Sequence, residues 1–398
     1  MASDLWSKTR EAAKTKIDDS AEALNELSQQ IWSHPELNFE EHKSHKFLTD
    51  FFEKEGFEVT RNYHLETAFK ATYGSDAGVH VCVICEYDAL PEIGHACGHN
   101  LIAECGAGAG LGIKAALERE ETPIGRVTVL GTPAEEAGGG KIDLINAGAF
   151  EGIDIAMMAH PFPNNVSRPM IIAVARMIIS YSGVASHAST CPWEGVNALD
   201  AAVMCYNNIS VMRQQLKPEW RVHGIFSKGG AKPNIIPEEA ELTYYLRAPT
   251  QEELSQLKKK IVGCTEGAAV ATGCKCSVTD LRGYANLITN PTMASIYEKE
   301  AGDMGVVFDK EGGSGSTDMG DVSYVVPSIH PFYYMGTTAA NHSRPFTAAA
   351  GAPEAQAPTL IQAKSMALTA LEIMKPGNED VLASVKKDFA CQMNGTMA

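Results

Sequence analysis

Residues 79–99 read VHVCVICEYDALPEIGHACGH and combine a short apolar run with a loop rich in metal-binding side chains. The apolar run, Val79–Cys85, is typical of a β-strand that is buried on both faces. The loop carries Cys97 and His99, which lie two residues apart and could face one ion. Thiolate, imidazole and carboxylate groups are common ligands of zinc and similar divalent cations. Either side chain alone would more often be a packing or surface residue, but the cluster after a strand favours a metal site.

Strand and helix patterns alternate on both sides of this stretch. Apolar runs at 126–130 and 153–158 predict two more buried strands. Helices are expected from about residue 100, near residue 142, and upstream at about 18–33 and 41–55. This alternation predicts an α/β fold with a mostly parallel, doubly wound sheet. In such sheets, ligands gather at the carboxyl ends of the strands.

The pattern changes after about residue 170. The elements expected from there follow the order β-α-β-β-α-β, which is typical of a four-stranded ferredoxin-like α+β domain. They are expected at 171–181, 198–215, 221–226, 240–247, 251–272 and 275–281. Helices and strands then resume, with final helices near 353–374 and 380–392. We therefore predict one α/β domain, formed by residues 1–172 and 287–398, that is interrupted by an insertion at 173–286.

The charge and the composition exclude several classes of protein. The formal net charge of the 398 residues is −16, which argues against a nucleic-acid partner and an anionic membrane surface. No stretch approaches about 18 uninterrupted apolar residues, so no transmembrane span is expected. Residues 1–16 lack the apolar core of a signal peptide. Ten cysteines without such a signal favour free thiols in a reducing compartment, and the expected location is cytoplasmic.

Three further segments carry candidate ligands. GTPAEEAGGG (131–140) follows an apolar strand and contains the adjacent carboxylates Glu135 and Glu136. One such carboxylate can bind metal while the other takes a proton from water, although a solvated acidic turn is the commoner meaning of the pair. His160 follows another strand, and His342 lies in a late polar loop. All segments together supply enough ligands to hold two divalent ions about 3.5–4 Å apart.

Other groupings of reactive residues are poorer candidates. Cys82 and Cys85 form a C-x-x-C, but within a strand their side chains point to opposite faces. Cys274 and Cys276 have no companion pair and are interpreted as structural. The sequence contains no G-x-S-x-G nucleophile elbow.

Five long motifs carry a resemblance to a known family. They are EYDALPEIGHACGHNLIAE (86–104), GTPAEEAGGGKIDLINAGAF (131–150), SHASTCPWEGVNALDAA (186–202), VHGIFSKGGAKPNIIP (222–237) and GSTDMGDVSYVVP (315–327). With these motifs the chain resembles metallopeptidase family 20, which includes aminoacylases, carnosinase-like dipeptidases and amino-acid-conjugate hydrolases. The motifs look most like the Xaa-Arg (β-alanyl-lysine) dipeptidase branch. The resemblance extends over nearly the whole chain.

The resemblance implies a dinuclear metal centre. The residues that match the family's ligands are Cys97, His99, Glu136, His160 and His342, with Cys97 bridging the ions. Glu135 matches the general base, and Asp88 matches the carboxylate that orients a ligand. Two divalent ions are expected, zinc first, with manganese or cobalt as alternatives.

The resemblance also assigns roles to the insertion, which it implies to be a lid and dimerisation domain. His187 matches a histidine that reaches into the partner subunit's site and stabilises the oxyanion. Asn234 and Arg247 match groups that hold the substrate's free carboxylate. A homodimer is therefore expected.

Two departures from the family pattern bear on this interpretation. Many members have His-x-Asp where this chain has Glu86-Tyr87-Asp88, so one ligand imidazole is absent there. The conjugate-hydrolase branches commonly have Asp after the second histidine, where this chain has Asn100. The second departure favours the dipeptidase branch.

The expected activity is metal-dependent hydrolysis of small dipeptides with a C-terminal Lys, Arg or ornithine. The alternative is an N-acyl-amino-acid hydrolase of the aminoacylase or aminobenzoyl-glutamate type, which would use the same metals and base. A more remote alternative is a non-catalytic metal-binding scaffold. The basic specificity is implied by the resemblance alone.

Overall fold

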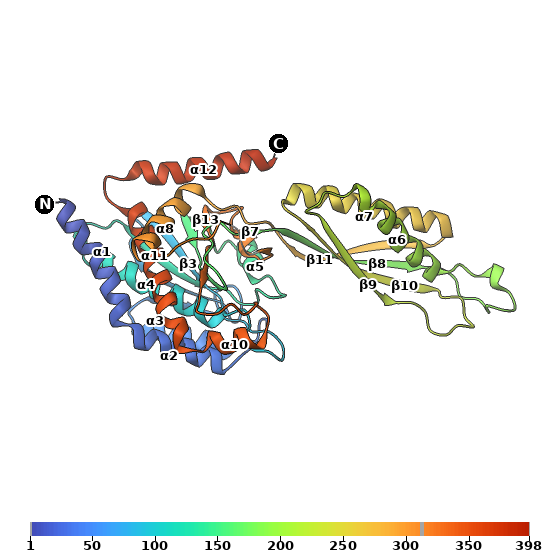
Figure 1. Cartoon of the computed structure of the whole chain (residues 1–398), viewed down its shortest axis with the longest axis horizontal. Coiled ribbons are helices and arrows are strands. Elements are labelled where there is room, and N and C mark those ends of the chain that lie inside the picture. The colour runs from blue at the N-terminus through green and yellow to red at the C-terminus, as the bar shows by residue number, and fades with distance from the viewer. Residues whose placement is uncertain (1, 311–313, 398) are drawn as a thin grey trace. The chain divides into compact units, whose positions relative to one another are not determined.

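Two compact units make up the chain in a computed structural model that describes residues 2–310 and 314–397. The larger unit comprises residues 1–170 and 287–398, and the smaller comprises residues 171–286 (Figure 1). Among the described residues, no helix has both the length and the apolar character required to cross a membrane.

A six-stranded sheet forms the centre of the larger unit. In spatial order its strands are β1 (Glu58–Arg61), β2 (Phe69–Gly74), β4 (Gly125–Gly131), β3 (Val79–Cys85), β5 (Ile155–Met157) and β13 (Ser328–Ile329). Pairing is parallel from β4 through β3 and β5 to β13, which confirms the predicted parallel core. The antiparallel strands β1 and β2 at one edge were not predicted, because their short segments lack a long apolar run.

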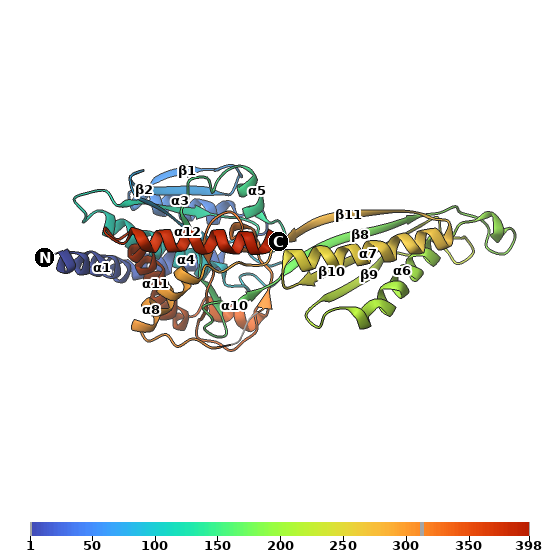
Figure 2. The ribbon, with the colours of Figure 1, turned by 90° about the horizontal axis from the view of Figure 1, so that it is seen from above.

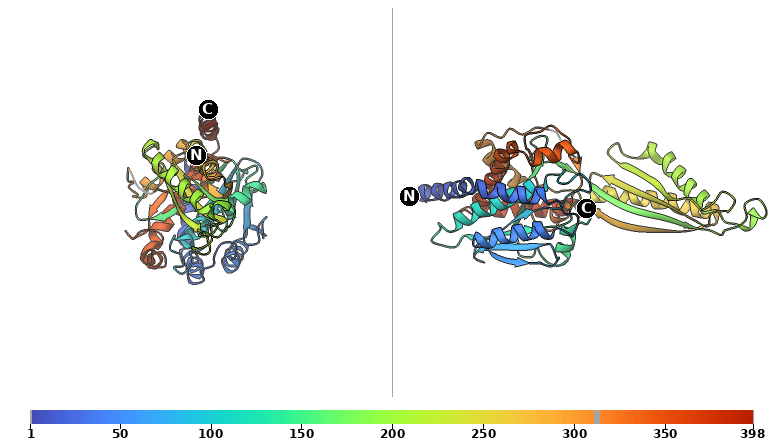
Figure 3. Two further views of the ribbon diagram at one scale, coloured as in Figure 1. Left: turned by 90° about the vertical axis from the view of Figure 1, so that its right-hand side faces the viewer. Right: turned by 90° about the horizontal axis from the view of Figure 1, so that it is seen from below.

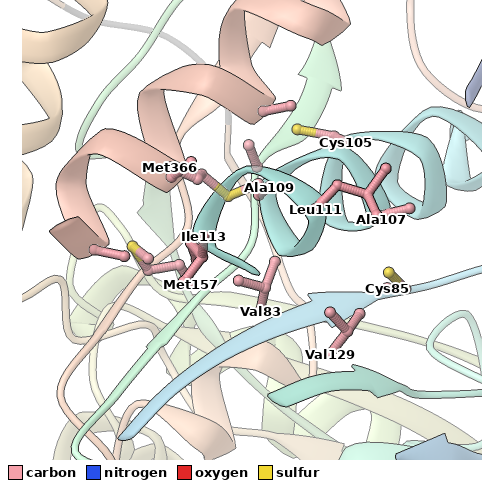
Figure 4. Close-up of a cluster of buried hydrophobic side chains, with 14 of the residues drawn as sticks. Val83, Cys85, Cys105, Ala107, Ala109, Leu111, Ile113, Val129, Met157 and Met366 are labelled. Carbon is pink, nitrogen blue, oxygen red and sulfur yellow. The ribbon is translucent and has the colours of Figure 1, made fainter. Parts of the chain in front are cut away.

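Strand β3 is buried on both faces, as its sequence predicts. Val81, Val83 and Cys85 belong to one hydrophobic core, whereas Cys82 and Ile84 belong to another. On the first face, α4 (His99–Leu117) packs between the strands and α11 (Gln356–Met374), as Figure 4 shows. On the second face lie α5 (Gly140–Asn146) and α9 (Met319–Val322). The sheet is therefore covered by helices on both sides, as in a doubly wound fold.

The N-terminal helices differ from the expectation. Instead of one helix at about 18–33, the chain forms α1 (Ala2–Asp19) and α2 (Ala21–Ser33), which precede α3 (His42–Lys54) and are drawn in blue in Figure 3. Helix α1 was missed because its sequence is largely polar. It buries Ala13 and Ile17, and it packs against α4 and α11. These tertiary contacts supply stability that an amphipathic pattern alone would not indicate.

The remaining elements of the larger unit lie mainly after the insertion. They are β6 (His160–Phe162), β7 (Met170–Ile171), α8 (Pro291–Asp303), β12 (Ser314–Gly315), β14 (Phe332–Tyr334), α10 (Arg344–Ala350) and α12 (Glu379–Met397), with a 3-10 turn at Pro353–Ala355. Strand β6 pairs in parallel with β14, and β7 pairs with β12. Helix α12 packs along α8 and α11 (Figure 2).

The smaller unit has the predicted β-α-β-β-α-β order. Its elements are β8 (Ala173–Ser182), α6 (Ala198–Met212), β9 (Arg221–Lys228), β10 (Glu239–Ala248), α7 (Gln251–Thr272) and β11 (Lys275–Tyr284), with 3-10 turns at Pro192–Glu194 and Arg213–Gln215. The antiparallel sheet has the order β11-β8-β10-β9, and both helices cover one face of it (Figure 1). This arrangement is the ferredoxin-like fold.

Candidate metal centre

The loops after β4, β3 and β5 bring four of the predicted ligand side chains together, and His342 joins them from the loop before α10. These strands are adjacent and parallel, so their carboxyl ends meet at one edge of the sheet. Three groups of ligand atoms each lie within 4.8 Å of one another. They are Cys97, His99 and His160; Cys97, Glu136 and His342; and His99, Glu135 and Glu136. Cys97, His99 and Glu136 each belong to two of these groups, as expected of a centre that holds two ions.

A tight turn brings Cys97 and His99 to the same site. Gly98 has φ of 79°, and a Cβ atom there would lie 2.6 Å from Pro161 Cγ. Only glycine fits this turn, because the left-handed conformation and the close approach both disfavour a side chain. His99 then begins α4, and its Nδ1 donates to Asp88 Oδ1 at 3.0 Å. This bond leaves the Nε2 lone pair directed at the site, as in metal-bound histidines.

His160 is oriented in a similar way by the backbone. Its Nδ1 donates to the carbonyl oxygen of Pro161 at 2.7 Å, and its Nε2 lies 3.3 Å from Cys97 Sγ. Burial lowers the pKa of His160 to about 4. The ring is therefore neutral at physiological pH, which is the form that binds metal.

The Glu135–Glu136 turn completes the cluster from the neighbouring strand. Asp88 Oδ2 accepts the backbone N–H of Glu136 at 3.0 Å, so one carboxylate orients both a histidine and this turn. Glu136 Oε1 lies 3.3 Å from His342 Nε2. Burial, together with the charge of Glu136, raises the pKa of Glu135 well above its usual value. A carboxyl group of raised pKa is suited to general acid–base chemistry near neutral pH.

The donor set fits divalent cations. Buried His99 Nε2 makes no hydrogen bond to the described residues, and its nearest carboxylate oxygens are Glu86 Oε2 at 3.5 Å and Glu136 Oε1 at 3.9 Å. Burial also raises the pKa of the Cys97 thiol, so the thiolate needs a cation beside it. Sulfur, imidazole and carboxylate donors in one buried cluster are characteristic of zinc and neighbouring transition metals.

A buried ion-pair cluster lies beneath this centre. Lys141 Nζ contacts Glu86 Oε1, and it donates to Asp318 Oδ1 at 2.7 Å. All three side chains are almost completely inaccessible to solvent. Glu86, which stands where many family members have histidine, therefore pairs with a lysine and belongs to none of the three ligand groups among the described residues.

His95 and Asn100 lie beside the ligands but point elsewhere. A ring nitrogen of His95 bonds to the carbonyl oxygen of Ile31 at 3.1 Å, and burial lowers the pKa of His95 to about 4. Asn100 Nδ2 donates to Ser28 Oγ and to the carbonyl oxygen of Ala350. Both residues thus anchor the start of α4 to its neighbours.

The predicted residues of the insertion lie in the smaller unit. His187 is exposed, and its Nδ1 accepts the Ser189 N–H at 3.3 Å, which leaves the proton on Nε2. The backbone carbonyl of Asn234 accepts the N–H of Ala188. Arg247 lies on the sheet face that the helices leave uncovered, where burial and then Arg176 lower its pKa.

Three residues that lie near the predicted site residues were not identified in the sequence. Arg176 lies on the same face as Arg247, over the rings of Tyr245 and Tyr284. The His330 ring packs edge-on against His160, at a centroid distance of 5.7 Å. A repeated His-Pro pair after adjacent strands, 160–161 and 330–331, was the available signal for it. Glu41 had no recognisable signal, because its contacts with Thr67 and Ala134 are distant in sequence.

An α/β metallohydrolase with an inserted ferredoxin-like domain is the class of protein that this fold and site define. A family model described as a peptidase dimerisation domain matches residues 173–272. The chain is 50% identical to the Xaa-Arg dipeptidase of Mus musculus, covering 98% of this chain and 94% of the relative. It is 48% identical to the Homo sapiens Xaa-Arg dipeptidase, covering 95% and 91%.

A solved structure shows the same fold. It is a dinuclear metal-binding M20 peptidase of Bacillus subtilis, with a TM-score of 0.70 and 20% identity over 89% of this chain and 99% of that one. The chain belongs to metallopeptidase family 20, and it is a metal-dependent hydrolase. The family resemblance and the fold class expected from the sequence are both confirmed.

Proposed function

We propose that this enzyme cleaves the amide bond of small dipeptides with a C-terminal Arg, Lys or ornithine. The observation that supports hydrolysis is the buried carboxylate of Glu135 beside five side chains that could hold metal ions. The basic specificity is supported by 50% identity, over nearly the full length, to a relative named for Xaa-Arg substrates.

Two divalent ions would be held by Cys97, His99, Glu136, His160 and His342. When bound, they supply Lewis-acid polarisation of the scissile carbonyl and lower the pKa of the attacking water. Zinc is the expected metal because the set contains thiolate and imidazole, with manganese and cobalt as alternatives.

Glu135 acts as the proton shuttle of this proposal. It takes a proton from the attacking water and later delivers that proton to the leaving amine. Asp88 keeps His99 and the 135–136 turn in register through its two hydrogen bonds. Its role is to position, not to react.

The smaller unit would supply the groups that recognise the substrate. His187, with its proton on Nε2, is suited to donate a hydrogen bond to the oxyanion that forms at the carbonyl. Asn234 and Arg247 would bind the free carboxylate of the dipeptide, for which a guanidinium group is well suited. We assign His187 to the site of the partner subunit.

A homodimer formed through the smaller unit is part of this proposal. Strand β9 is an edge strand, so one side of its backbone is available for pairing. Ile225 on β9 and Val211 on α6 are exposed, at 66% and 77%. Edge strands and exposed apolar side chains of this kind are characteristic of association surfaces. The match of residues 173–272 to a peptidase dimerisation domain supports the same assignment.

A cytoplasmic location completes the proposal. All ten cysteines lie in described segments and are free thiols, several of them in the cores of the two units. Free thiols are the usual state in a reducing compartment. Fractionation of the native protein would check this location.

The decisive experiment is a substrate panel with metal analysis of the same preparation. We expect turnover of dipeptides ending in Arg, Lys or ornithine, and about two metal ions per chain. N-acetyl and aminobenzoyl amino acids form the comparison arm. Preferential cleavage of the N-acetyl or aminobenzoyl amino acids would reject the dipeptidase assignment. If no amide is turned over in a metal-dependent way, a non-catalytic metal-binding scaffold is the remaining alternative.

The proposed base has its own test. Glu135→Gln keeps the shape of the side chain but cannot take a proton. It should lower kcat by about 10²-fold or more while the metal content stays unchanged. Retained turnover in this variant would contradict the role of Glu135.

A further inference from the structure

Glu41 lies far from the ligands in sequence, yet it contacts the turn that carries the proposed base. It directly precedes α3 and is completely buried. Its Oε1 accepts the backbone N–H of Ala134 at 2.9 Å and that of Phe39 at 3.0 Å. Its Oε2 accepts the hydroxyl of Thr67 at 2.8 Å. Three donors from separate segments therefore fix this carboxylate.

Ala134, the residue immediately before Glu135, has a strained backbone. Its φ is 62°, in the left-handed region that an alanine rarely adopts. Such a conformation persists only when the surrounding structure enforces it. The Glu41 hydrogen bond to the Ala134 N–H is the contact that holds this peptide from outside the loop.

The packing around the turn enforces the same geometry. Gly138 N and Gly139 N both donate to the carbonyl oxygen of Ala134, at 3.1 and 2.7 Å. A Cβ atom on Gly138 would lie 2.5 Å from the Phe39 ring and 2.7 Å from Ala134 Cβ. Phe39, itself tied to Glu41, therefore closes over the turn.

On the other side of the base, Asp88 accepts the N–H of Glu136 at 3.0 Å. The backbone N–H groups of the two residues that flank Glu135 are thus each held by a buried carboxylate from another part of the chain. We propose that Glu41 is a positioning residue, which holds Ala134 in the left-handed conformation and thereby aims the Glu135 side chain at the metal centre. This inference rests on the proposed role of Glu135 as the base.

The test compares Glu41→Ala, Glu41→Gln and the double variant Glu41→Ala/Ala134→Gly. In Glu41→Ala, Ala134 can leave the left-handed conformation, and this relaxation is favoured by roughly the free energy that one left-handed residue costs. Glu135 is then displaced in most molecules, so we expect kcat to fall about tenfold or more. KM and the metal content should remain as in the parent enzyme. Glu41→Gln should recover most of kcat, because its amide oxygen can still accept both N–H groups.

Ala134→Gly is the informative second change. Glycine adopts positive φ without strain, so the double variant should regain much of the kcat lost in Glu41→Ala. A merely structural role of Glu41 predicts recovery of thermal stability at most. No recovery of kcat in the double variant, or an unchanged kcat in Glu41→Ala, would overturn the proposal.

Glu300→Ala is the matched control. Glu300 is also buried, at 3% exposure, but it bonds to Arg10 on α1 and lies outside the catalytic loops. The Glu300→Ala substitution should lower the stability of the protein and leave kcat unchanged. If Glu41→Ala does not fold, Thr67→Val gives a milder version, with an expected loss of about threefold in kcat. An unchanged kcat there would also count against the proposal.

A crystal structure of Glu41→Ala separates this inference from the proposed function. We expect a negative φ at Ala134 and a displaced Glu135 side chain. A φ that stays positive, with Glu135 in place, would overturn the positioning role even if the enzyme is an active dipeptidase. Conversely, a parent enzyme that cleaves none of the substrates would reject the proposed function without affecting this readout.

Discussion

The larger unit contains buried carboxyl groups in two different environments. Glu135 faces the metal-binding cluster, whereas Glu104 lies inside the larger unit on α4. Burial raises the pKa of Glu104 to about 8, against weaker lowering by Gln356 and Ser28. Gln356 Nε2 donates to Glu104 Oε2 at 2.9 Å. Glu104 is therefore protonated in the folded protein at neutral pH, and its contribution to stability depends on pH.

Glu104→Gln should reveal this dependence. The folded pKa is raised above the unfolded value of 4.5, so the contribution of Glu104 is fully present below about pH 4.5 and is lost as pH rises to about 8. Glutamine does not titrate. The unfolding free energy of the variant minus that of the parent should thus increase between pH 5 and pH 8, by on the order of 1–3 kcal/mol. Urea unfolding at both pH values measures it, and an equal difference at both would contradict the protonation assigned here.

At the scale of single elements, α4 connects the metal centre to the core. Its first residue is the proposed ligand His99, and most of its length is buried between the sheet and α11 (Figure 4). A Cβ atom on Gly106 would lie 2.6 Å from Cys85 Sγ and 2.9 Å from the carbonyl oxygen of Ile84. The small residues of this helix thus set how closely it approaches β3.

Gly106→Ala should therefore destabilise the protein despite the better helix propensity of alanine. Overpacking against a strand backbone costs about 1–3 kcal/mol of unfolding free energy. Gly263→Ala in α7 is the matched control, since a Cβ atom on Gly263 would have nothing within 4 Å of it. That control should gain about 0.5–1 kcal/mol. Chemical unfolding compares the two, and equal effects would show that packing at Gly106 is not limiting.

The organisation of the whole molecule adds a test of the dimer. If His187 acts on the partner's site, homodimers of Glu135→Gln and homodimers of His187→Ala are both impaired. The first variant still carries His187, and the second still carries Glu135. Mixing and re-forming dimers should restore about a quarter of parental activity, because half the dimers are mixed and each has one intact site. Activity assays with and without subunit exchange measure this gain. No gain after confirmed exchange would place His187 in the site of its own chain.

Local patterns in the sequence were sufficient for much of the architecture. The buried runs around Val83 and Val129 and the elements of the smaller unit were predicted from the local pattern of apolar residues. Because the carboxyl ends of adjacent parallel strands meet, those runs also indicated that Cys97, His99 and Glu136 would come together. The family resemblance rested on the same segments.

The long-range contacts were decided by tertiary packing. The polar helix α1 is held by α4 and α11, Asn100 turns to Ser28 and Ala350, and Lys141 pairs with Glu86. The bond from Ala134 to Glu41 joins residues 93 positions apart. By itself, the sequence determined which segments are strands, helices and ligand-bearing loops, because burial periodicity and side-chain chemistry are local. Which buried polar groups pair was decided only by the folded structure, since that choice depends on segments that meet after the chain has packed.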